Sequence, residues 1–403
     1  MAVLEGVVLL SLALLAYAWV GYPAALLLSD SLREAARAAR FLGLGSERRA
    51  APLHAALPRV SLVFSAHDEE LCIREKVKNA LELDWPAAKL EILVACDGCS
   101  DRTATFAREV GGDRVRVLEH PRLGKTAAVS ELVQAASGDV VVLTDANVLL
   151  ERNALRALLR AFQDSRVGAA VGRLALADPQ DREPKEGVYW LYESLVKWLE
   201  GRHGCVLGAN GGIYAARRKL FPSLPADTIV DDFVVPLCLA LDGWRVPYVP
   251  DAIGREETPG DDAAEFGRRS RIGAGDWQAL ARLPRILDPR HGFIAFAFFS
   301  HKLLRWVSPA FLSVSFVGSA VLWASRGGIF EALFLLQLAF YLLAALGERA
   351  PRIIRRPALL ARHFVLMHAA LAVGFWRFIR GSQRAAWDRT LRRGGEPLPG
   401  EGA

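Results

Sequence analysis

Two oxygen-bearing side chains follow a run of apolar residues near the middle of the chain. The segment "VVVLTDAN" spans residues 140–147 and ends with Asp145 and Asn147, which are separated by one alanine. A carboxylate and an amide in this pattern can hold a divalent cation through oxygen atoms, the ligands that Mg²⁺ and Mn²⁺ prefer. The same residues can also form an ordinary Asx turn after a strand, so the segment alone leaves both interpretations open.

Carboxylates follow other apolar runs in the same way. Asp68 and Glu69 come after an apolar run at residues 59–66, and Asp97 comes after another at residues 90–96. Such carboxylates repel one another unless a cation or a hydrogen-bonding ligand lies among them. A divalent cation in a site of this kind usually bridges the phosphate oxygens of a nucleotide.

The segments that must position these residues alternate in type. Strands are predicted at residues 59–66, 90–96, 114–119 and 139–145, with helices between them at residues 69–83, 101–110 and 125–137. This alternation predicts an α/β domain with a mostly parallel sheet and helices on both faces. Ligands bind such sheets beyond the carboxyl ends of the strands, where the acidic residues stand.

A P-loop is excluded. "RLGKT" at residues 122–126 would need a glycine five positions before Gly124, and Glu119 stands there. Gly124 and Lys125 can still open a helix beside a phosphate group.

The chain has five cysteines, all in its middle part. Cys96 and Cys99 form a C-x-x-C pair, but no second ligand pair stands at the spacing of a zinc site. We therefore interpret the two as small packing residues in a turn, in a domain whose thiols stay reduced.

Long apolar segments lie at both ends of this 403-residue chain, of which 52% is hydrophobic. Residues 7–28 and 307–325 carry no charge, and residues 329–346 carry only Glu331, so each is long enough to cross a bilayer. The shorter run at residues 364–376 is expected to enter the membrane without fully crossing it. The net charge of +6 fits anionic headgroups or a phosphorylated substrate, and no basic-aromatic pattern indicates nucleic acid.

An arginine-rich segment at residues 347–363 sets the orientation. Short basic loops stay on the cytoplasmic side, which places the large middle segment there too. We expect an N-terminal transmembrane helix, a linker or interfacial segment, a globular domain, an interfacial helix, a C-terminal transmembrane region and a basic tail. Their predicted ranges are 1–29, 30–57, 58–290, 291–306, 307–380 and 381–403.

Taken together, the motifs resemble those of membrane-bound family 2 glycosyltransferases. "SAHDEE" resembles the first-strand motif of the family, "ACDGCSD" its Asp-Asp-Gly-Ser element, "RLGKTAAV" its Arg-x-Gly-Lys helix start and "TDAN" its Asp-x-Asp motif. The resemblance covers roughly residues 58–282. It implies a GT-A, Rossmann-like nucleotide-sugar domain with a mixed, mostly parallel sheet, flanked by N-terminal and C-terminal transmembrane helices.

The resemblance also implies roles for individual residues. Asp145 and Asn147 would hold Mg²⁺ or Mn²⁺ against a diphosphate. The nucleotide would contact Ala66, Asp68, Glu69, Asp97, Lys125 and Asp145. The sequence departs from the family pattern at Cys96, where an aspartate is usual, and at Asn147, whose neutral amide should bind metal more weakly.

The second half of the domain resembles the acceptor side of the family. "GANGG" would place Asn210, Gly211 and Gly212 against the acceptor. A plain turn before a strand is the alternative for this segment.

"TIVDDF" would make Asp232 the general base, with Asp231 beside it. Two acidic residues that simply begin a helix are the alternative. Arg268 and Arg271 stand where processive members carry Gln-x-x-Arg-Trp, so Arg268 would face the acceptor and Arg271 would stabilise the leaving diphosphate. A solvated helix face is the alternative for the arginines.

These implications converge on an inverting, metal-dependent glycosyltransferase that moves a sugar from a nucleotide donor, UDP-linked by expectation, to a membrane-associated lipid or glycan. We expect a multi-pass protein of the inner membrane with a cytoplasmic catalytic domain, and further copies of the chain or polysaccharide-export proteins as partners. Transfer to polyprenyl phosphate, a catalytically inactive relative and a nucleotide-sensing membrane subunit stay open as alternatives.

Overall fold

A computed structural model describes residues 1–44, 57–177, 187–209, 211–257 and 262–384. The chain forms two compact units. The sheet unit is built on Asp30–Asp262, and the helical unit combines Met1–Ser29 with Ala263–Gln383. The first carries most of the predicted site residues, and the second carries the long apolar segments.

The sheet unit contains one eight-stranded sheet, in the order β3-β2-β1-β4-β7-β6-β8-β5. Strands β1, β2, β3 and β4 are mutually parallel where they pair, β6 is parallel to β8, and β7 and β5 run antiparallel to their neighbours. The strands are β1 Val60–Ala66, β2 Leu90–Asp97, β3 Val115–His120, β4 Val140–Leu143, β5 Val148–Leu150, β6 Ala169–Ala177, β7 Tyr214–Arg217 and β8 Tyr248–Glu257. The predicted mixed, mostly parallel sheet is therefore confirmed.

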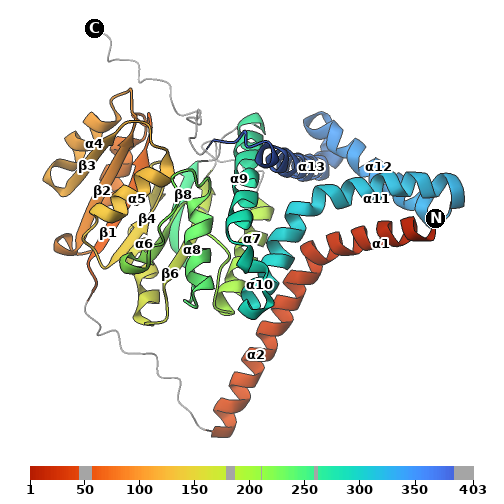
Figure 1. The fold of residues 1–403 in the computed structure, drawn as a ribbon, viewed down its shortest axis with the longest axis horizontal. Coiled ribbons are helices and arrows are strands. Elements are labelled where there is room, and N and C mark those ends of the chain that lie inside the picture. The colour runs from red at the N-terminus through yellow and green to blue at the C-terminus, as the bar shows by residue number, and fades with distance from the viewer. Residues whose placement is uncertain (45–56, 178–186, 210, 258–261, 385–403) are drawn as a thin grey trace. The chain divides into compact units, whose positions relative to one another are not determined.

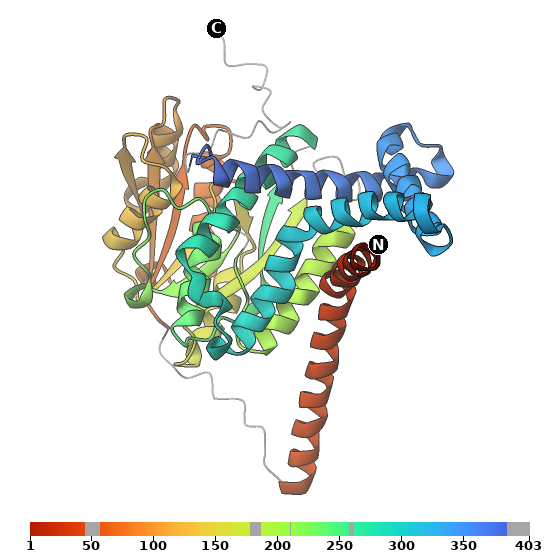
Figure 2. The same ribbon diagram turned by 45° about the vertical axis from the view of Figure 1, so that its right-hand side comes forward.

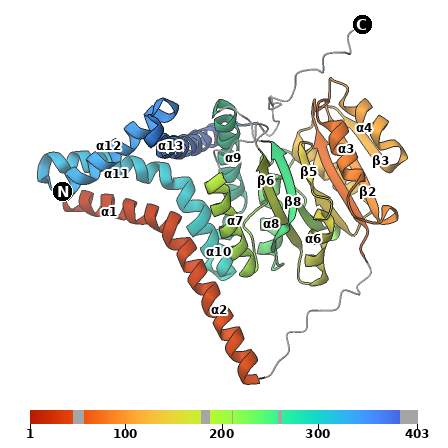
Figure 3. The ribbon, with the colours of Figure 1, turned by 180° about the vertical axis from the view of Figure 1, so that it is seen from behind.

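Helices cover both faces of this sheet (Figures 1 and 3). Helices α3, α4 and α6 bury one face in a single apolar core with Leu62 and Phe64 of β1, whereas α5 packs on β1 and β2 from the other side. Every residue of β1 is buried, as a strand covered on both faces requires. The helices of this unit are α3 Ile73–Leu81, α4 Thr103–Gly111, α5 Lys125–Ala135, α6 Ala154–Arg160, α7 Gly187–Arg202 and α8 Asp231–Leu241.

Two elements are shorter than the sequence predicts. Helix α3 begins at Ile73 rather than near Glu69, because Asp68 has a φ of 52° and the residues after it form a turn first. Strand β4 ends at Leu143, so Asp145 lies in the loop beyond the sheet edge. Both differences lengthen the loops that carry the polar residues.

The helical unit contains α1 Ala2–Ala16, α9 Asp262–Arg282, α10 Phe293–Ala297, α11 Leu304–Arg326, α12 Ile329–Leu346 and α13 Arg352–Ile379. Figure 2 shows α1 running on into α2, Tyr22–Leu44, through the π-helical turn Tyr17–Gly21. A second π-helical segment, Phe298–Leu303, joins α10 to α11.

The first helix of the chain packs against a helix near the other end. Val8 of α1 is buried together with Leu322 and Phe330, and a Cβ added at Gly318 would lie 2.4 Å from Val8 Cγ2. Arg326 forms an ion pair with Glu5, with 2.8 Å between Nε and Oε1, at the end of the same contact. A glycine at this point lets α1 and α11 approach closely, as small residues do between membrane helices.

Within the described residues, four helical stretches are long and apolar enough to cross a membrane: Ala2–Ala39, Phe293–Arg326, Ile329–Arg349 and Arg352–Ile379. The predicted interfacial helix at residues 291–306 continues into the next stretch without a break. The fourth apolar run lies within α13, a helix of 28 residues with the length and composition to cross.

Candidate active site

Asp145 and Asp232 meet at one glycine. A Cβ built on Gly211 would lie 2.8 Å from Asp145 Oδ2 and 3.3 Å from Asp232 Oδ2, so both carboxylates lie close to the same point beside the Gly211 backbone. Gly211 has a φ of +72°, a conformation that glycine adopts readily and other residues do not. Only glycine therefore suits this position, and the structure brings together three of the predicted residues.

Lys125 provides the positive charge at this point. Its Nζ donates to Asp145 Oδ1 over 2.6 Å, and both side chains keep about a quarter to a third of their surface exposed, 26% and 30%. Burial disfavours the ammonium ion, but the carboxylates of Asp145, Asp231 and Asp232 outweigh it and raise the pKa of Lys125 above its usual value. Lys125 therefore stays protonated among three acidic residues.

Lys76, which no sequence motif marks, holds both ends of the loop that carries Asp145 by hydrogen bonds. Its side chain is fully buried, and its Nζ donates to Thr144 Oγ1 over 3.1 Å and to the carbonyl of Val148. Thr144 Oγ1 in turn donates to the Gly212 carbonyl over 2.7 Å. Lys76 lies on the same helix face as the buried residues Ile73 and Ala80, and that spacing is the signal that could have revealed it.

The donor set around Asn147 fits an oxygen-liganded cation. Asn147 Nδ2 donates to Glu256 Oε1 over 2.8 Å, which leaves the amide oxygen as the atom that Asn147 can offer. Glu256 lies on β8, opposite Val148 in the sheet register. Asp145, Asn147 and Glu256 together present only oxygen ligands, as Mg²⁺ or Mn²⁺ requires.

Asp97 anchors the loop that precedes Lys125. Its side chain is fully buried, Oδ1 accepts from the Leu123 amide over 2.6 Å, and Oδ2 accepts from the Gly124 amide over 3.0 Å. A buried carboxylate at the N-terminus of α5 is favoured by the orphan amides and the helix dipole. Asp97 thereby fixes where Lys125 begins its helix, and its contact with a nucleotide stays a prediction.

The other predicted nucleotide residues lie at the ends of β1 and in the turn after it. Ala66 is the last residue of β1 and is buried. The amide of Glu69 donates to Thr103 Oγ1 over 2.8 Å, which ties this turn to the start of α4. Because β1 and β2 pair in parallel, Asp68 and Asp97 emerge at the same sheet edge.

Asp231 and Asp232 begin α8, where negative charge is favourable. Asp231 is buried, whereas Asp232 is partly exposed and faces Gly211. Thr126 Oγ1 donates to the Thr228 carbonyl over 2.8 Å, which joins the start of α5 to the segment before α8. Asp232 is therefore the better placed of the two to meet a ligand.

The remaining predicted residues lie elsewhere in the chain. Asn210 is outside the described residues. Arg268 and Arg271 are on α9 in the helical unit, where Arg268 makes a two-pronged ion pair with Glu265 over 2.8 and 3.0 Å. Their roles toward an acceptor and a diphosphate stay predictions.

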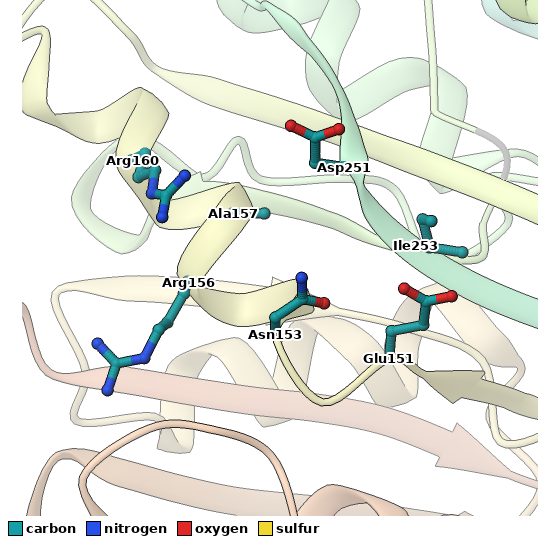
Figure 4. A pocket seen from close by; sticks show the side chains of 7 residues that line it. All are labelled: Glu151, Asn153, Arg156, Ala157, Arg160, Asp251 and Ile253. Atoms are coloured by element: carbon teal, nitrogen blue, oxygen red, sulfur yellow. The ribbon is translucent and has the colours of Figure 1, made fainter.

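A surface hollow of about 300 Å³ on the sheet unit contains none of these residues (Figure 4). Its polar residues Glu151 and Arg156 are in ion pairs with Arg255 and Asp84. The hollow lies past the end of β5 that is remote from Asn147, and we assign it no function.

The comparisons with known proteins bear on this site. Residues 61–221 match the model of the family described as glycosyl transferase family 2. The chain carries a family 2 glycosyltransferase domain. The matched range includes Asp68, Asp97, Lys125, Asp145 and Gly211, and ends before Asp232.

Several curated glycosyltransferases are similar to the chain. A beta-monoglucosyldiacylglycerol synthase of Trichormus variabilis is 25% identical over 237 residues, which are 56% of this chain and 50% of that protein. The probable glycosyltransferase YdaM of Bacillus subtilis is 25% identical over 307 residues, 71% of this chain and 72% of that protein. The chain thus spans about half the length of the first of these relatives.

A solved structure confirms the predicted GT-A fold. The mannosyltransferase PcManGT from Pyrobaculum calidifontis, in complex with GDP-mannose and Mn²⁺, superposes with a TM-score of 0.67 at 23% sequence identity. The superposition covers 93% of this chain and 99% of that one, so the likeness extends over the glycosyltransferase domain and the helices that flank it.

Proposed function

We propose that this protein is an inverting glycosyltransferase that moves a sugar from a nucleoside diphosphate donor, UDP-linked in our view, to a hydroxyl group of a membrane-associated lipid or glycan. The single observation that supports it best is the approach of Asp145 and Asp232 to the same point beside Gly211. A residue of the donor motif and a candidate base that lie so close could act on one substrate.

The chemical step follows from the roles of the carboxylates. Asp232 takes the proton of the acceptor hydroxyl as the oxygen attacks the anomeric carbon. The new carbon–oxygen bond forms as the bond to the diphosphate breaks, and the nucleoside diphosphate leaves with the electron pair. Attack opposite the leaving group inverts the anomeric centre. A partly exposed carboxylate suits a neutral hydroxyl, whereas a phosphate acceptor is already nucleophilic and needs no base.

Asp145 and Asn147 would hold Mg²⁺ or Mn²⁺, with Glu256 orienting the Asn147 amide. When bound, such an ion neutralises the charge that grows on the departing diphosphate. Lys125 keeps Asp145 in place and adds a second positive charge beside it. Arg271 is our candidate for a further contact to the diphosphate.

Four helices in the part of the chain that the structure describes are long and apolar enough to cross a membrane, and they support a membrane-bound acceptor. The arginine-rich segment near residues 347–363 supports a cytoplasmic catalytic domain at the inner membrane. A relative named as a synthase of beta-monoglucosyldiacylglycerol supports a glycolipid product, and relatives named N-acetylglucosaminyltransferase support a glycan product.

The test is transfer by membranes that contain the full chain, with a panel of nucleotide sugars, Mg²⁺ or Mn²⁺, and lipid extract. We expect one donor to be turned over by the wild type, with a loss of about 10²–10⁴-fold in Asp232→Asn and a large loss in Asp145→Asn. Asp139→Asn, at the opposite end of β4, and Asp242→Asn, at the opposite end of α8, are matched controls that should keep activity.

Nucleotide binding without turnover of any donor would instead favour a sensing or inactive relative. Equal losses in the control variants would show that the assay reports folding rather than the site.

A further inference from the structure

A second group of metal-binding side chains lies at the ends of β1 and β2. The ligating atoms of His67, Asp68 and Cys99 all lie within 4.8 Å of one another. His67 and Asp68 follow β1, and Cys99 follows β2, whose residue Cys96 pairs with Ala66 in the parallel register. The sheet therefore brings two further candidate ligands, His67 and Asp68, to one cysteine of the C-x-x-C pair.

The orientation of His67 suits a metal ligand. Its Nδ1 lies 2.7 Å from the carbonyl of Asp97, which can only accept, so the ring proton resides on Nδ1. The lone pair is then on Nε2, which lies 3.6 Å from Asp68 Oδ2. Histidines that bind metals commonly donate their other ring N–H to a carbonyl group in this way.

The oxygen and sulfur ligands are held in place as well. The amide of Ser100 donates to Asp68 Oδ1 over 2.7 Å. Cys99 Sγ lies 3.4 Å from the Ala66 carbonyl, and its thiol is hydrogen-bonded to that of Cys96. The side chains of His67 and Asp68 keep 16% and 24% of their surface exposed, so the group opens to solvent on one side.

We propose that His67, Asp68 and Cys99 form a site for a thiophilic divalent cation, Zn²⁺ by its ligand preference. Imidazole nitrogen, thiolate sulfur and carboxylate oxygen are the three ligand types of zinc, whereas Mg²⁺ and Mn²⁺ avoid sulfur. Three protein ligands leave the fourth position of a tetrahedron open to water or another ligand. The site is separate from Asp145 and Asn147 and does not depend on the proposed function.

The site backs directly onto Asp97. The carbonyl of Asp97 accepts from His67, and its carboxylate holds the amides of Leu123 and Gly124. A bound cation would therefore join the ends of β1 and β2 and steady the loop that leads to Lys125. It would also draw Asp68 into a metal contact rather than the direct nucleotide contact that the resemblance implies.

The test uses Co²⁺ as a spectroscopic probe for Zn²⁺. The full chain in detergent is treated with a chelator, the chelator is removed, and Co²⁺ is added in steps while the absorption spectrum is recorded. We expect one equivalent of Co²⁺ to produce a thiolate-to-cobalt charge-transfer band in the near ultraviolet, and Zn²⁺ to abolish it. Thermal unfolding of each variant shows whether it is folded.

Cys99→Ser should remove the band, and His67→Gln should weaken binding by at least about tenfold, since loss of a group that merely orients a ligand costs about 10–100-fold. Cys238→Ser, at a half-buried cysteine of α8, is the matched control and should keep the band, as should Asp145→Asn. No band in the folded wild type, or a band that persists in Cys99→Ser, would overturn the proposal.

Discussion

Replacing Gly211 with alanine tests the arrangement of the two carboxylates directly. The new Cβ would lie 2.8 Å from Asp145 Oδ2, so this carboxylate must retreat by several tenths of an ångström, and Asp232 at 3.3 Å is crowded too. Displacements of about 1 Å in a reacting constellation cost on the order of 10²-fold in rate. Because the shift here is smaller than 1 Å, we expect the rate of sugar transfer in Gly211→Ala to fall by about tenfold or more, up to about 10²-fold.

The same substitution also strains the backbone. Alanine at a φ of +72° costs about 1–2 kcal/mol, which corresponds to a fall in the melting temperature of the domain of roughly 2–8 °C. Gly243 is the matched control, because it has a φ of +89° and an added Cβ would meet no atom within 4 Å. Gly243→Ala should therefore lose similar stability while its rate of transfer is unchanged.

The assay compares initial rates and thermal unfolding of both variants in the same detergent, well below their melting temperatures. A Gly211→Ala protein with the wild-type rate would refute the reasoning, since it would mean that the positions of Asp145 and Asp232 do not control transfer. Equal rate losses in both variants would attribute the effect to backbone strain alone.

Three further predictions concern charged residues of the sheet unit. Burial lowers the pKa of Lys76 from 10.5 to about 7. Between pH 7 and pH 10.5 the unfolded chain therefore keeps a proton on Lys76 that the folded chain has lost, so the stability of the wild type should rise as the pH is raised from 7 toward 10. An equal rise in the melting temperature of Lys76→Met over this pH range would contradict the prediction. Asp97→Ala should destabilise the domain by at least about 1–3 kcal/mol, because the buried amide of Gly124 loses its acceptor, and the partly buried amide of Leu123 adds a smaller loss; an unchanged melting temperature would count against the capping role. Lys125→Met should raise the KM for the donor sugar, while the free energy of unfolding changes by only about 0–1 kcal/mol because the ion pair of Lys125 with Asp145 is partly exposed. Lys125→Arg should restore part of the lost donor affinity. An unchanged KM in Lys125→Met would argue against a role of Lys125 in donor binding.

Sequence patterns predicted the first half of the sheet closely. Strand β2 was expected at residues 90–96 and forms at Leu90–Asp97, and α5 was expected to begin at Lys125 and does so. Buried parallel strands read as continuous apolar runs, so this signal is local.

The contacts that join distant segments were not predictable in this way. The ion pair of Lys125 with Asp145 and the approach of Gly211 to Asp232 depend on how the strands pair, which single residues do not encode. Cys99 shows the same limit, because the residues that would complete its proposed ligand set follow the neighbouring strand. Sequence spacing finds ligands along one segment and misses those that the sheet assembles.

The packing of α1 against α11 has a consequence for biosynthesis. Helix α11 provides Leu322, which helps to bury Val8, and Arg326, which pairs with Glu5. The ribosome makes this helix long after α1. At about 5–20 residues per second, α1 waits roughly 15–60 s for that partner, and the whole sheet unit emerges in the interval. The order of synthesis therefore gives the glycosyltransferase domain time to fold before the two ends of the chain close the helical unit around one shared contact.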